Sequence, residues 1–164
     1  MSLMNAQIWI AIAVGVAAMV DDLARRHIAN WIPVAALAGG IGWQVGRDGA
    51  HGLLTALGGA ALGFGAFLVF YLLGGMGGGD VKLMAGFGAL LGASHILEAA
   101  LWAAGIGGVL ALGAIGWQSV APAAARISGK AGVRLTPQEK ERNATIPYAP
   151  AITFGVWLAL IPKT

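Results

Sequence analysis

Two acidic segments of this 164-residue chain have residue types that could carry out chemistry. One is the doublet Asp21-Asp22, and the other is Asp80. Both adjoin strongly apolar sequence, where an ionisable group is costly and is therefore a candidate functional group. Two carboxyl groups that lie close together share one proton, because like charges do not both ionise easily. Such a pair can activate water and protonate a leaving amine, which are the two tasks of amide hydrolysis.

A glycine-rich run, residues 74–79, precedes Asp80. Glycine is a poor helix former, so we expect an irregular loop here. The last three positions, Gly77, Gly78 and Gly79, are expected to position a substrate backbone, because they place no side chain beside the carboxylate.

Simpler interpretations of the same acidic residues stay open at this point. Aspartate is a favoured helix N-cap, and its charge suits the positive end of a helix, so Asp80 could simply begin a helix. Asp21 and Asp22 could be solvated residues that end the first apolar segment.

The composition predicts an integral membrane protein. Hydrophobic residues make up 58% of the chain and charged residues only 10%, with a mean hydropathy of +0.78. Soluble domains have about 25% charged residues. Apolar runs recur along the whole chain, so we expect one membrane domain over residues 1–164.

Several kinds of site are not expected. The absence of cysteine excludes disulfides and thiol chemistry. His27, His51 and His95 fall in three different loops, so we expect no metal site and no cofactor. The net charge of +3 comes from basic residues in loops, which indicates membrane orientation rather than binding to nucleic acid.

Six apolar segments approach the roughly 20 residues that a helix needs to cross a bilayer. They predict spans at about 3–20, 31–45, 52–73, 81–93, 96–120 and 147–161. Residues 121–145 form a polar segment that we expect to be a loop. The fold class is therefore predicted to be an all-α bundle of six transmembrane helices in contact with lipid.

The distribution of basic residues predicts the orientation of this bundle. The loops after the first, third and fifth spans hold most of them: Arg25, Arg26, Lys82, Arg126, Lys130, Arg134, Lys140 and Arg142. The opposite face has only Arg47 and Lys163, so the first face is expected to be cytoplasmic and both termini to lie on the other side. Asp22 and Asp80 then lie on the same cytoplasmic face.

Three segments resemble motifs of the prepilin peptidase family, which are GxGD-type membrane aspartic proteases. They are Asp22-Leu23 with Arg26, Ile28, Asn30 and Trp31, then Gly77-Gly78-Gly79-Asp80-Val81-Lys82-Leu83-Met84, and finally Ile146-Pro147-Tyr148-Ala149-Pro150. The three occur in the family's order and extend over most of the chain.

The resemblance implies a six-span aspartic endopeptidase of the bacterial inner membrane, whose catalytic pair is Asp22 and Asp80, with Asp21 as the alternate. Four further motif residues would support the site: Lys82, Asn30, Pro147 and Tyr148. The substrate would be a prepilin or pseudopilin with a basic leader. Because the chain lacks the cysteine-bearing insertion of the larger bifunctional members, it resembles the short form of Flp or Tad pilus systems, without methyltransferase activity.

Two alternatives from other functional classes remain. In a small ion-coupled transporter, Asp80 beside broken helices would bind a cation. In a non-catalytic pilus or secretion assembly scaffold, the aspartates would only cap helices.

Overall fold

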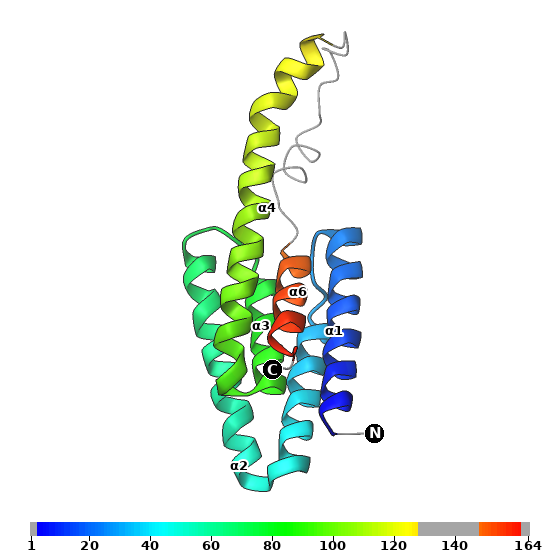
Figure 1. Cartoon of the computed structure of the whole chain (residues 1–164), viewed down its shortest axis with the longest axis vertical. Helices are drawn as coiled ribbons and strands as arrows, with labels where there is room; N and C mark the ends of the chain where they lie inside the picture. The colour runs from blue at the N-terminus through cyan, green and yellow to red at the C-terminus, as the bar shows by residue number, and fades with distance from the viewer. Residues whose placement is uncertain (1–2, 128–147, 162–164) are drawn as a thin grey trace.

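The computed structural model describes residues 3–127 and 148–161, and this part of the chain is helical with no strand. The helices, labelled in Figure 1, are α1 (Leu3–Arg25), α2 (Trp31–Leu72), α3 (Gly78–Leu91), α4 (Ala93–Ile127) and α6 (Ala149–Ala159). The prediction of an all-α membrane protein is consistent with this architecture.

Three of the described helices are long and apolar enough to cross a membrane: α1, α2 and α4. Two predicted spans lie within the 42 residues of α2, which contains non-helical backbone at Gly49 (φ 57°, ψ −131°). Figure 1 shows the chain reversing there, so that the two arms of α2 run in opposite directions. With 14 residues in α3 and 11 in α6, both fall short of the roughly 20 that a span needs, and the six-span count stays a prediction.

Three helix ends differ from the expected boundaries. α1 continues through the acidic doublet to Arg25. α4 begins at Ala93 and continues to Ile127, so the first part of the predicted 121–145 loop is helical, in agreement with the strong helix propensity of its alanines. The rest of that segment, with Pro147, lies outside the described residues.

The glycine-rich run also differs from the expected irregular loop, because its glycines end one helix and begin the next. Gly74 has a φ of 76°, and its N–H donates to the carbonyl of Tyr71, while that of Gly75 donates to the carbonyl of Phe70. These two bonds form a Schellman motif that ends α2. Helix α3 then begins at Gly78, three residues earlier than the predicted span.

Helix α3 packs against both arms of α2 through glycines that bring the backbones close together. A Cβ atom on Gly40 would lie 2.5 Å from the amide nitrogen of Leu90. On the second arm, a Cβ atom on Gly63 would lie 2.5 Å from the carbonyl oxygen of Met84, and Gly59 contacts the backbone of Gly88. Gly59 and Gly63 are therefore packing residues that let the two helices approach closely.

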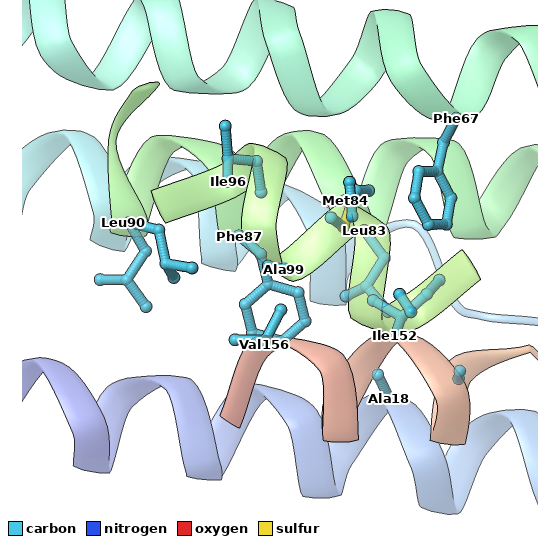
Figure 2. Packing of buried hydrophobic residues seen from close by; sticks show 14 of the residues in the cluster. Ala18, Phe67, Leu83, Met84, Phe87, Leu90, Ile96, Ala99, Ile152 and Val156 are labelled. Atoms are coloured by element: carbon cyan, nitrogen blue, oxygen red, sulfur yellow. The ribbon is translucent and has the colours of Figure 1, made fainter. Parts of the chain in front are cut away.

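The hydrophobic core lies between α3 and the helices around it. Figure 2 shows side chains from several helices meeting there, including Phe67 of α2, Phe87 of α3, Ala99 of α4 and Val156 of α6. All four are nearly inaccessible to solvent.

Helix α6 is attached to α1 by side-chain hydrogen bonds to backbone carbonyls. The hydroxyl of Thr153 donates to the carbonyl of Gly15 (3.3 Å), and the indole of Trp157 donates to that of Ala11 (3.4 Å). The first turn of α6 thereby lies beside the last turn of α1, at the end of the bundle where α3 begins (Figure 1).

Candidate active site

Asp22 and Asp80 line one pocket of about 650 Å³ at this end of the bundle. Their side chains come from the last turn of α1 and the first turn of α3, and only 6% and 7% of their surfaces are exposed. The other lining residues come mainly from the two connections beside them: Arg26, His27, Ile28, Asn30, Gly74, Gly75, Met76, Gly77, Gly78, Gly79, Lys82 and Tyr148. The pocket thus brings together two carboxyl groups from separate sequence segments, as the topology predicted.

Asp80 is the third residue of α3, and its carboxylate reaches back to the residue that precedes the helix. Its Oδ2 accepts a hydrogen bond from the N–H of Gly77 (3.1 Å), which is half of a capping box. Asp80 lies outside the segments long enough to span a membrane. Burial and the nearby charge of Asp22 raise its pKa to about 7, against the opposing effect of the Gly77 hydrogen bond. Near neutral pH this carboxyl group can therefore hold or release a proton.

Asp22 is oriented by a different helix. Its Oδ2 accepts a hydrogen bond from the backbone N–H of Ala149 (3.1 Å), the first residue of α6. This N–H is among the first amides of a helix, which have no partner within the helix. The bond thus orients the carboxylate and connects α6 to the pocket.

Asp21, the alternate candidate, has a structural environment of its own. One carboxylate oxygen accepts the N–H of Ala29 (2.7 Å), and the other lies 3.1 Å from Nε of Arg25. Asp21 does not line the pocket. Its bonds stabilise the connection between α1 and α2, whereas the adjacent Asp22 lines the pocket together with Asp80.

Two of the expected supporting residues contact each other at the pocket. Nζ of Lys82 donates to the side-chain oxygen of Asn30 (3.0 Å), which joins α3 to the connection before α2. Both side chains are exposed. Tyr148 also lines the pocket, and its ring packs on α4, where a Cβ atom on Gly107 would lie 2.8 Å from Cε1.

Comparison with known proteins identifies the family. The family model of the type IV leader peptidases matches residues 9–112, a range that includes both Asp22 and Asp80. The chain belongs to the type IV leader peptidase family. No curated protein and no solved structure matches the chain.

Membership of the type IV leader peptidase family implies proteolytic activity of the leader peptidase type and a prepilin-like substrate. It agrees with the apolar helices in indicating a membrane protein. Helix α6 and Tyr148 lie beyond the matched range, so their part in this site rests on the structure and on the motif resemblance of residues 146–150 rather than on the family match.

The three glycines before Asp80 differ in what surrounds them. Gly77 and Gly78 line the pocket, and a Cβ atom on either would meet its nearest neighbour only at 3.4 or 3.6 Å. A Cβ atom on Gly79 would lie 3.2 Å from that of Ile28, so this position is tightly packed. Gly79 therefore keeps α3 close to the α1–α2 connection, in addition to lining the pocket.

Sequence reasoning did not single out Arg26 and His27 as site residues, although both line the pocket. Arg26 has a φ of 55°, a left-handed conformation that helix ends usually assign to glycine or asparagine. Arginine as a residue type gives no indication of this conformation.

Within residues 3–127 and 148–161, no three acidic or histidine side chains gather as they would around a metal ion.

Proposed function

We propose that this member of the leader peptidase family is an aspartic endopeptidase whose catalytic residues are Asp22 and Asp80. The observation that carries the proposal is that these two buried carboxyl groups, from α1 and α3, line one pocket. Its volume of about 650 Å³ lies within the range of roughly 300–1,000 Å³ of ligand-binding clefts.

The two carboxyl groups together supply what amide hydrolysis requires. The ionised carboxylate takes a proton from a water molecule while the oxygen of that water attacks the scissile carbonyl carbon. The protonated carboxyl group gives its proton to the leaving nitrogen. The products are a carboxylic acid and an amine, and the pair is left holding one proton, as before. A pKa of about 7 at Asp80 supports this division, because the pair then holds one proton near neutral pH.

The substrate we propose is a type IV prepilin-like precursor of the Flp or Tad type. Its basic leader would be removed at the cytoplasmic face of the bacterial inner membrane, without subsequent methylation. The charge distribution and the absence of cysteine support these finer statements. Gly77, Gly78 and Gly79 would position the scissile backbone, and Lys82, Asn30 and Tyr148 would maintain the pocket.

Co-expression with a tagged prepilin tests the proposal through leader removal on a gel. Asp80→Asn and Asp22→Asn are each expected to reduce cleavage by roughly 10²–10⁴-fold, the usual contribution of a positioned acid or base. Asparagine still has an oxygen that can accept the hydrogen bond from Gly77 or Ala149. These substitutions therefore separate catalysis from capping.

Asp21→Asn is the matched control, because Asp21 is adjacent in sequence but does not line the pocket. It is expected to retain most of the cleavage. Undiminished cleavage by both Asp22→Asn and Asp80→Asn would overturn the proposal and favour the scaffold alternative.

A further inference from the structure

A second, smaller pocket adjoins the candidate active site. Its volume is about 110 Å³, and it shares Gly75, Met76 and Tyr148 with the larger pocket. Its remaining walls are Phe67 and Phe70 at the end of α2 and Ala103, Ala104 and Gly108 of α4. The two pockets are therefore neighbours that share these three residues as a common wall.

The two pockets differ in charge. The larger one is lined by Asp22, Asp80, Arg26 and Lys82, whereas no ionised side chain lines the smaller one. Such a cavity favours an apolar group, because a buried polar group without a hydrogen-bond partner is costly.

The smaller pocket also extends into the apolar part of the bundle. Its walls on α2 and α4 lie within the helical stretches 31–72 and 93–114, which are long and apolar enough to span a membrane, whereas Asp80 lies outside them. A substrate that places polar groups in the larger pocket and an apolar side chain in the smaller one would match this change of surroundings.

Tyr148 forms the wall between the two environments. It immediately precedes α6, whose first N–H binds Asp22, and its ring packs on Gly107 of α4. The N-terminal end of α6 thus orients the Asp22 carboxylate in the larger pocket, and the adjacent Tyr148 lines the smaller one.

We propose that the smaller pocket binds the apolar side chain of the substrate residue that directly follows the scissile bond. This inference rests on the proposed function. A cavity of about 150 Å³ holds a benzene molecule, so a pocket of about 110 Å³ suits an aliphatic side chain such as that of leucine.

The test uses the purified full-length protein and prepilin substrates that carry leucine, alanine or asparagine after the scissile bond. The unmodified enzyme is expected to cleave the leucine substrate with a kcat/KM at least about tenfold above that of the alanine substrate, the usual lower limit for apolar pocket discrimination. The asparagine substrate, similar in size to leucine but polar, is expected to be the poorest. Equal kcat/KM for leucine and asparagine would overturn the inference.

Gly108→Leu narrows the pocket, because Gly108 lines it and a Cβ atom there meets nothing within 4 Å. We expect kcat/KM for the leucine substrate to fall by about tenfold or more, with that for the alanine substrate little changed. Gly113→Leu is the matched control, since Gly113 lies on the same helix, has equally free space and does not line the pocket. An equal loss for both substrates in Gly108→Leu would contradict the inference.

Phe70→Ala gives an independent test in the opposite direction. The Phe70 side chain lines the pocket and is 41% exposed, so its truncation removes little of the core. Enlargement is expected to raise the cleavage of a phenylalanine substrate relative to leucine, and an unchanged ratio would count against the pocket. If cleavage depends on Asp80 but shows no preference for the residue after the scissile bond, this inference alone is overturned. If the unmodified enzyme does not cleave, the proposed function is overturned as well.

Discussion

The two ends of α3 lie beside buried or partly buried polar groups in opposite circumstances. At its C-terminal end, the side-chain amides of Gln7 and Gln44 both donate to the carbonyl of Leu90, at 2.8 and 3.1 Å. At its N-terminal end, Asp22 and Asp80 line a pocket of about 650 Å³. At the first end, called the closed end below, two neutral amides donate to one backbone carbonyl. The second, open end keeps two ionisable groups beside the pocket.

This difference shows how a small helical bundle divides stability from reactivity. Glycines at the closed end let backbones approach closely, so packing and hydrogen bonding both favour the folded state. At the open end, burial and a like charge raise the pKa of Asp80, which means that its ionised form is unfavourable in the folded protein. Functional sites commonly retain such unfavourable groups at some cost in stability.

The largest effect on stability is expected from a change at the closed end. Gly59→Ala places a methyl group against the backbone of Gly88, and we expect it to lower the free energy of unfolding by about 1–3 kcal/mol, as overpacking usually does. Gly58→Ala is the matched control, because the nearest atom to its Cβ would be Ala93 Cβ at 4.0 Å. Thermal unfolding in detergent would measure both, and equal melting temperatures would contradict the close approach of α2 to α3.

At the open end, Asp80→Asn is expected to stabilise the folded protein while it removes activity. Because the folded pKa of about 7 exceeds the usual 3.8, the stabilising effect of the bound proton is complete below 3.8 and is lost as pH rises through about 7. Asparagine does not ionise, so the variant does not lose stability at this position as the pH rises. Its Tm should therefore exceed that of the parent at pH 8 and approach it at pH 4. A difference in Tm that is the same at both pH values would argue against a raised pKa.

The smallest effect is expected where the open end contacts solvent. Lys82→Met removes the hydrogen bond to Asn30, but both residues are exposed, so the free energy of unfolding should change by less than about 1 kcal/mol. Cleavage should decline only modestly. A loss of cleavage as large as that of Asp80→Asn would instead indicate that Lys82 acts directly in the chemistry.

The sequence was informative where alternating membrane crossings and charge determine the arrangement. These placed Asp22 and Asp80 at one face, and the structure brings both into one pocket. Sequence motifs also indicated the family, which the family model shows. Residue type could not distinguish Asp21 from Asp22, although the family resemblance favoured Asp22. Adjacent helical residues point in different directions, and the tertiary contacts show the different environment of each.

Other features escaped prediction for similar physical reasons. The bond from Ala149 to Asp22 comes from a backbone amide, which every residue but proline has. The glycine-rich run forms two helix ends because a Schellman motif and the hydrogen bond from Gly77 to Asp80 act together there, against the low helix propensity of glycine. The continuation of α4 to Ile127 followed local propensity rather than the polar character of the segment as a whole.

The most direct test of the central claim is the titration of Asp80 itself. Difference infrared spectroscopy of the parent against Asp80→Asn would follow its carboxyl C=O band with pH. We predict loss of that band with a midpoint near pH 7, and a lower midpoint in Asp22→Asn, because the neighbouring charge that raises the pKa is then gone. A midpoint near the ordinary 3.8, or one that Asp22→Asn leaves unchanged, would contradict the account of two carboxyl groups acting as a pair.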